Sequence, residues 1–199
     1  MVNTMQGFSI EGYAIVSADG MIADRNGHMP DGLKCDADAR FFTEGLDSAA
    51  LVVHGRHSHE RQGSASDRRR RMIVSDRSLG FSVHASIPNA WVWNPASMAF
   101  EKACRGIGVT EGKIAVSGGT GVFALFLKIG FDAFHLSRAA KPMLPGGLPV
   151  FPEVPGKTSG QVLSEHGLKL AAVQLLDREA DVALVTWKRE RDHGEPASR

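Results

Sequence analysis

Apolar runs rich in β-forming residues alternate with helix-forming stretches over much of the sequence. Strands are expected at residues 8–16, 49–53, 71–74, 90–93, 113–116 and 131–137, and helices at 36–47, 57–61, 98–107 and 122–128. Parallel strands need a crossover, usually a helix, to return the chain to the same end of the sheet. The alternation therefore predicts an α/β fold built on a mostly parallel sheet.

The last third of the sequence departs from this pattern. Residues 142–155 are rich in proline and glycine, which indicates an irregular segment. Two β-rich runs follow, at 168–176 and 182–187, and the polar residues 177–181 between them indicate a hairpin. We therefore expect a central, mostly parallel eight-stranded sheet, flanked by about four helices and completed by a C-terminal antiparallel hairpin.

The size and charge of the chain limit the classes of protein to which it can belong. Its 199 residues fit one domain, which we expect over 1–189, followed by a polar tail at 190–199. The formal net charge is only +1. A chain without a basic surplus lacks the electrostatic attraction that holds nucleic acid, so we expect no nucleic-acid partner.

The sequence also indicates a compartment. Its apolar runs are far shorter than the ~20 residues that cross a bilayer, so we expect no membrane association. The N-terminus lacks the basic start and apolar core of a secretion signal. The two cysteines, Cys35 and Cys104, have neither disulfide-framework nor zinc-site spacing. We expect a cytoplasmic protein with reduced thiols and no metal.

A glycine-rich turn is the strongest candidate for a binding site. Gly118, Gly119, Thr120 and Gly121 separate the strand at 113–116 from the helix that includes Val122. Such a turn lets the backbone approach an anion closely and directs the first amides of the helix toward it. The same residues would also suit a tight turn without a ligand.

Two more expected strands end in residues suited to phosphate. Gly55, Arg56 and His57 follow the strand at 49–53, and Ser75 and Arg77 follow the strand at 71–74. In open α/β sheets, ligands bind at the carboxyl ends of the strands. Three such ends favour a nucleotide site more strongly than any one of them.

The order of these motifs resembles the dihydrofolate reductase superfamily. The resemblance rests on the segments 17–23, 53–57, 74–75, 116–119 and 146–151, and on Asp38 four residues before Phe42. The opening Ser-x-Asp-Gly-x-Ile-Ala and the segment 141–151 are most similar to the reductase domain of the riboflavin-biosynthesis deaminase-reductase. This resemblance spans about residues 8–187. It implies a mostly parallel eight-stranded sheet, NADPH as cofactor and a homodimer.

The resemblance also implies roles for single residues. Gly118, Gly119, Thr120, Gly121 and Val122 would hold the pyrophosphate of NADPH; Gly55, Arg56 and His57 its phosphates; Ser75 and Arg77 the adenosine 2′-phosphate; and Ile15 and Ile22 would flank the nicotinamide.

On the substrate side, the resemblance assigns a carboxylate to the hydride acceptor. Alignment through Phe42 makes this residue Asp38, whereas alignment from Met29 and Pro30 makes it Asp36. Arg69 falls where a folate-binding arginine would lie. We expect Asp38 to be partly desolvated, with a raised pKa.

The expected function follows from these assignments. It is NADPH-dependent hydride transfer to a C=N or C=O group of a small pterin-, pyrimidine- or sugar-like substrate. A non-catalytic nucleotide-binding or regulatory module on the same fold is the alternative.

Overall fold

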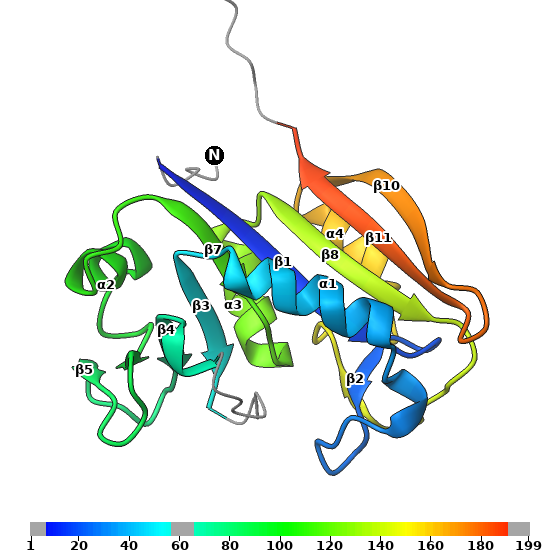
Figure 1. Cartoon of the computed structure of the whole chain (residues 1–199), viewed down its shortest axis with the longest axis horizontal. Helices are drawn as coiled ribbons and strands as arrows, with labels where there is room; N and C mark the ends of the chain where they lie inside the picture. The colour runs from blue at the N-terminus through cyan, green and yellow to red at the C-terminus, as the bar shows by residue number, and fades with distance from the viewer. Residues whose placement is uncertain (1–6, 57–65, 191–199) are drawn as a thin grey trace, which may run out of the picture.

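A computed structural model describes residues 7–56 and 66–190. Within these ranges the main sheet has nine strands in the order β10-β11-β8-β1-β7-β3-β4-β6-β5, and β2 and β9 form a separate pair (Figure 1). The strands are β1 (Phe8–Val16), β2 (Met21–Ala23), β3 (Leu51–Gly55), β4 (Arg71–Val74), β5 (Phe81–Val83), β6 (Ala90–Trp93), β7 (Gly112–Val116), β8 (Ala133–Ala139), β9 (Leu148–Pro149), β10 (Leu168–Asp177) and β11 (Val182–Arg189). The helices are α1 (Asp36–Asp47), α2 (Phe100–Gly106), α3 (Thr120–Ile129) and α4 (Ser159–Glu165).

The expected fold class is confirmed. Strand β1 lies in the middle of the sheet, parallel to both β7 and β8, and β3, β4, β6 and β7 continue the parallel part. The hairpin β10–β11 joins it antiparallel through β8. The sheet has nine strands in the described residues rather than eight, because β5 adds an antiparallel strand that the sequence did not indicate.

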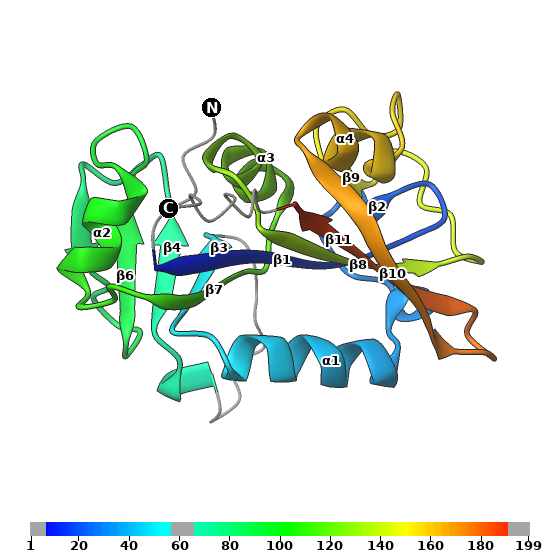
Figure 2. The same cartoon turned by 90° about the horizontal axis from the view of Figure 1, so that it is seen from above.

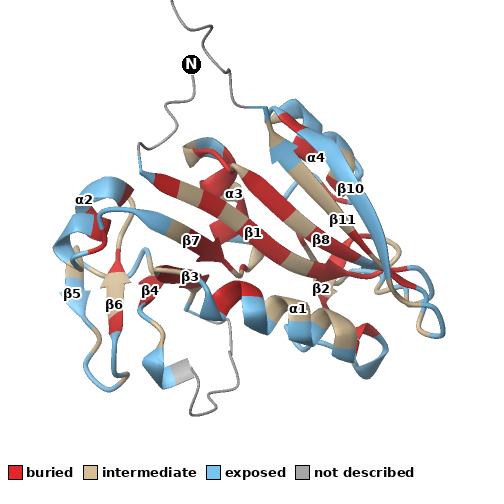
Figure 3. Ribbon diagram, turned by 45° about the horizontal axis from the view of Figure 1, so that its top comes forward, coloured by how far each residue is buried: buried red, intermediate tan, exposed pale blue. Residues whose placement is uncertain are grey.

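Helices cover both faces of the sheet. Figure 2 shows α1 on one face and α3 and α4 on the other. The main core lies on the α3 side, where the rings of Phe123, Phe134 and Phe151 pack edge to face with centroids 5.2–6.2 Å apart. Figure 3 shows the central strands buried along most of their length, as expected for parallel strands covered on both faces.

Helix α4 was not predicted, because the prolines before it indicated an irregular segment throughout. Thr158 is its N-cap: the Thr158 hydroxyl accepts from the Gln161 amide, and the Gln161 side chain accepts from the Thr158 amide. This reciprocal capping box is a sequence signal for a helix start. The helix expected at 57–61 and most of the tail at 190–199 lie outside the described residues. In the part of the chain that is described, no helix has the length and apolarity to cross a bilayer.

Candidate functional site

Three of the predicted strand ends come together at one edge of the sheet. The order β7-β3-β4 makes these strands neighbours, and all run parallel. Gly55 at the end of β3 is in register with Val74 at the end of β4. The Gly55 amide also donates a 2.8 Å hydrogen bond to the carbonyl of Gly118, which follows β7. The turns after β3 and β7 are therefore directly joined.

The glycine turn has a backbone that side chains would disturb. Gly118 has a φ of 103°, and a Cβ there would lie 2.9 Å from the Phe123 ring. Its peptide bond to Gly119 is cis. Gly119 is the N-cap of α3, and its carbonyl accepts from the amides of Val122 and Phe123. The amides of Thr120 and Gly121 belong to the first turn, whose N–H groups have no acceptor within the helix.

The space in front of this turn suits an anion. A Cβ at Gly121 would meet no atom within 4 Å. The first turn of α3 has no acidic residue, so nothing there opposes the positive end of the helix dipole. The side chains of Thr120 and Val122 already make contacts within the protein. The Thr120 hydroxyl donates to the Pro149 carbonyl, and Val122 is buried. Only the backbone of these two residues is left for a ligand.

The end of β4 offers side chains of both signs. Ser75 is half-buried, and its hydroxyl accepts from the Arg77 amide at 3.3 Å. Arg77 is exposed, as are Arg56 after β3 and Asp76 between Ser75 and Arg77. Either guanidinium group would attract a phosphate at this edge of the sheet, whereas the Asp76 carboxylate would repel one. His57 lies outside the described residues.

The loop between β1 and β2 lies between the glycine turn and the segment before β9. The Ile22 Cδ1 atom lies 3.7 Å from the position that a Cβ on Gly119 would occupy. The Asp19 carboxylate accepts from the Ser17 hydroxyl at 2.6 Å and from the Leu144 amide at 3.0 Å. These bonds hold the loop against the segment before β9. Ile22 is thereby fixed beside the glycine turn.

Asp38 and Ser137 form the polar part of a second, more apolar region. Burial raises the pKa of the Asp38 carboxyl, and the hydroxyl of Ser137 only partly offsets this rise. Ser137 is 1% exposed, and among the described residues its Oγ has no hydrogen bond of normal geometry. It is in register with Ile15 on β1. Ile15 packs with an apolar cluster that includes Leu33 and Cys35.

The structure distinguishes the two candidate carboxylates. Asp36 is the first residue of α1 and is exposed, whereas Asp38 is partly buried against β8. Arg69 forms an ion pair with Asp47 at the end of α1, 2.8 Å apart. Within the described ranges, no three metal-ligating side chains gather at one point.

Sequence reasoning missed Ser137 and the role of Asp19. Ser137 was expected only as the last residue of a strand, and nothing nearby in the sequence indicates that α1 brings Asp38 to it. Asp19 was recognised only as part of a motif. Asp19 lies two residues after Ser17, a spacing typical of a side chain that hydrogen-bonds within a turn. This spacing could have predicted the bond from the sequence.

A separate polar cluster lies beneath α1, near the amino-terminal ends of β7 and β8. Tyr13 donates a 2.6 Å hydrogen bond to Glu11 Oε2, with His135 Nε2 3.5 Å and Lys113 Nζ 3.9 Å from the same oxygen. Burial alone would raise the pKa of Glu11, but hydrogen bonds from His135 and Tyr13 and the charge of Lys113 lower it to about 2. The cluster borders an open hollow of about 320 Å³.

Comparison with known proteins shows the fold. No protein-family model matches the sequence, and no curated protein matches it. A putative riboflavin biosynthesis protein from Shewanella sp. PV-4 matches with a TM-score of 0.62 at 16% identity, over 92% of this chain and 99% of that chain. Dihydrofolate reductase from Enterococcus faecalis, complexed with NADP(H) and RAB-propyl, matches with a TM-score of 0.63 at 16% identity, over 94% and 99%.

A bifunctional enzyme also matches. It is the diaminohydroxyphosphoribosylaminopyrimidine deaminase/5-amino-6-(5-phosphoribosylamino)uracil reductase from Thermotoga maritima, with a TM-score of 0.62 at 15% identity. The match covers 91% of this chain but 56% of that one. The chain therefore has the dihydrofolate reductase-like fold expected from the motifs, shared with a riboflavin-biosynthesis reductase and a dihydrofolate reductase.

Proposed function

We propose that this chain is an NADPH-dependent reductase that transfers hydride to a C=N or C=O group of a small pterin-, pyrimidine- or sugar-like molecule. One observation carries the proposal: a carboxyl whose pKa is raised by burial, that of Asp38, faces a buried hydroxyl without another partner, that of Ser137. Such a pair is costly to keep in a core and is typical of a site that binds a polar ligand.

The glycine turn fits the cofactor. The open space at Gly121 and the first-turn amides of α3 would receive the pyrophosphate of NADPH, with Arg56, Ser75 and Arg77 at its remaining phosphates. When bound, NADPH supplies the hydride. The solved structures that the chain resembles include a reductase complexed with NADP(H).

The chain itself would hold and orient the acceptor. Asp38 would accept a hydrogen bond from an N–H of the acceptor, or keep a proton close to the atom that is reduced. A raised pKa leaves a larger share of this carboxyl protonated near neutral pH than an exposed aspartate would have. Ile15 and Ile22, on either side of the β1–β2 loop, would shield the nicotinamide from water. Alignment of two reactants contributes about 7–11 kcal/mol in favourable cases.

A turnover assay tests the proposal. Purified protein is mixed with NADPH and a panel of dihydropterins, pyrimidine ribosides and simple carbonyl compounds, and NADPH oxidation and product mass are followed. Consumption of NADPH with one class, lost in Asp38→Asn, is the expected result. Binding of NADPH without consumption by any member of the panel would favour a non-catalytic nucleotide-binding module.

A further inference from the structure

The hollow beneath α1 is a cavity that the proposed reductase site does not use. It has a volume of about 320 Å³ and is lined by residues of α1, β1, β7, β8 and β11. Its lining carries both charges, with the carboxylates of Glu11 and Glu44 and the ammonium groups of Lys113 and Lys188. A cavity with this lining suits a polar ligand better than an apolar one.

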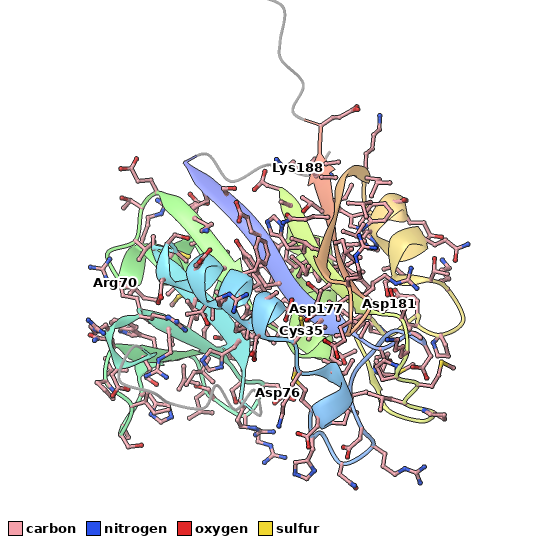
Figure 4. The ribbon with its side chains drawn as sticks, turned by 45° about the vertical axis from the view of Figure 1, so that its right-hand side comes forward. Cys35, Arg70, Asp76, Asp177, Asp181 and Lys188 are labelled. Atoms are coloured by element: carbon pink, nitrogen blue, oxygen red, sulfur yellow. The ribbon has the colours of Figure 1, made fainter. Side chains whose placement is uncertain are left out.

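The hollow lies apart from the glycine turn and from Asp38. Lys113 is the second residue of β7, whereas Gly118 follows the other end of that strand. Lys188 lies near the end of β11, whereas Val182 at its start packs with Cys35, which precedes α1. Figure 4 shows Lys188 toward one end of the sheet and Cys35 toward the other. A ligand in the hollow would therefore occupy a second site.

The inner charges of the hollow are held by one another. The Glu11 carboxylate accepts from Tyr13 and lies close to His135 and Lys113, as described above. Lys113 Nζ also donates a 2.5 Å hydrogen bond to the hydroxyl of Ser48, which follows α1. These bonds form a fixed polar network that ties α1 to the sheet.

The charges at the rim have no such partners. Glu44 on α1 and Lys188 on β11 are exposed and line the same hollow, yet within the described residues neither forms an ion pair with the other or with a third group. Lys188 also lies directly opposite Lys169 across the β10–β11 pair, and like charges placed this way are destabilising. Lys169 is itself paired with Glu190 at 2.7 Å. The rim thus offers one carboxylate and one ammonium group to a ligand.

An apolar surface lies between these charges. Lys188, Ala133 and Glu11 are in register across β11, β8 and β1. Since neighbouring strands are about 4.8 Å apart, the Cα atoms of the outer two residues are separated by about 10 Å, with only the small Ala133 side chain between them. Phe41 lines the hollow from α1, and its half-buried ring packs edge to face with His135 at 5.3 Å. The hollow therefore has room for an apolar group between opposite charges.

We propose that this hollow binds a small zwitterion, an α-amino acid with an apolar side chain. Its carboxylate contacts Lys188, its ammonium group contacts Glu44, and its side chain packs against Phe41 and Ala133. A ligand with only a negative charge would be repelled by Glu44, and one with only a positive charge by Lys188, whereas a zwitterion complements both. The proposal is independent of the proposed reductase function.

The test compares three compounds with the same aromatic body in titration calorimetry. L-phenylalanine carries both charges, 3-phenylpropanoate lacks the ammonium group, and 2-phenylethylamine lacks the carboxylate. L-phenylalanine should bind at least about tenfold more tightly than either of the others, because each of them loses one charge-assisted contact.

Two rim variants assign the contacts. Lys188→Gln and Glu44→Gln should each weaken L-phenylalanine binding by at least about tenfold. Lys188→Gln should also weaken 3-phenylpropanoate but not 2-phenylethylamine, and Glu44→Gln should do the reverse. Lys128→Gln and Glu153→Gln remove exposed charges outside the hollow and should leave all three affinities unchanged.

Equal affinities for the three compounds, no binding of L-phenylalanine at millimolar concentration, or binding that survives both rim variants would overturn the proposal. Far-UV circular dichroism verifies that each variant is folded. The rise in Tm with NADPH, measured on the same samples, should be equal in Lys188→Gln and the unmodified chain, so that the cofactor site is tested separately.

Discussion

The amide of Gly55 donates a 2.8 Å hydrogen bond to the carbonyl of Gly118, and this bond joins the ends of two neighbouring parallel strands. A Cβ on Gly55 would lie 3.3 Å from Val122 and one on Gly118 2.9 Å from Phe123. Both turns therefore depend on glycine for close packing, while Gly121, one turn further, faces open space. This contrast allows the site to be tested without damage to the fold.

Gly121→Asp should abolish NADPH binding. The substitution places a negative charge at the first turn of α3, where it stabilises the helix but repels a phosphate. In the unmodified protein, a hundredfold excess of NADPH over its Kd adds about 2.7 kcal/mol of stability, or roughly 5–10 °C in Tm. This shift should vanish in Gly121→Asp. Gly121→Asn, equal in size and uncharged, should keep most of it, as measured by thermal unfolding.

Asp38→Asn should lower turnover by about 10²–10⁴-fold, while NADPH affinity stays nearly unchanged. Asp36→Asn is the control: it removes an exposed carboxylate from the same helix turn and should leave turnover intact. If Asp36→Asn abolishes turnover and Asp38→Asn does not, the assignment of the acceptor carboxylate is wrong.

Because the pKa of Asp38 is raised, Asp38→Asn should also change the stability of the protein. A carboxyl whose pKa is higher in the folded than in the unfolded protein destabilises the fold where it is ionised, above its folded pKa. Asp38→Asn should therefore increase the free energy of unfolding at neutral pH. The difference should disappear below the ordinary aspartate pKa of about 3.9, as measured by urea unfolding across pH.

Arg77→Ala should weaken NADPH binding about 10- to 100-fold and leave NADH almost unchanged, because a guanidinium pairs with the 2′-phosphate that NADH lacks. Asp76→Asn should act in the opposite direction, since it removes a carboxylate beside the same phosphate. Titration calorimetry with both cofactors measures these effects. Equal affinities of the unmodified chain for NADPH and NADH would contradict the assignment of Arg77.

Glu11→Gln should destabilise the protein at neutral pH by up to about 3 kcal/mol. This is the free energy that corresponds to a carboxyl pKa lowered from 4.5 to about 2 by folding. A lowered carboxylate pKa stabilises the fold above pH 4.5, and this contribution is lost as the pH falls toward 2. The difference between the two proteins should therefore shrink across that range in urea unfolding. Glu44→Gln, on the exposed rim of the same hollow, should have little effect.

The parts of the structure that follow from local pattern were predictable. Strand β1 and helix α1 have the expected bounds, because alternation and apolar spacing are strong over nine and twelve residues. Strands β5 and β9, with three and two residues, are too short to show a period. They exist because neighbouring strands offer them hydrogen bonds.

The candidate site likewise has a part that follows from local sequence and a part that depends on which strands become neighbours. The turns that we propose for phosphate binding are local, so glycine and arginine at expected strand ends were enough to predict where these turns lie. The pairing of Asp38 with Ser137 and the cluster around Glu11 depend on which strands become neighbours. Local sequence does not contain that information.

The central place of β1 also sets the order in which the sheet can form during synthesis. Its partners come much later in the chain, since Phe8 pairs with Gly112 and Glu11 with Ala133. At a typical ribosomal rate, β1 waits about 5–20 s before β7 has been made. Throughout this interval the nine-residue strand β1 has neither of its two sheet neighbours. The yield of folded protein in a cell should therefore respond more to chaperone supply and translation speed than to the stability of the finished sheet.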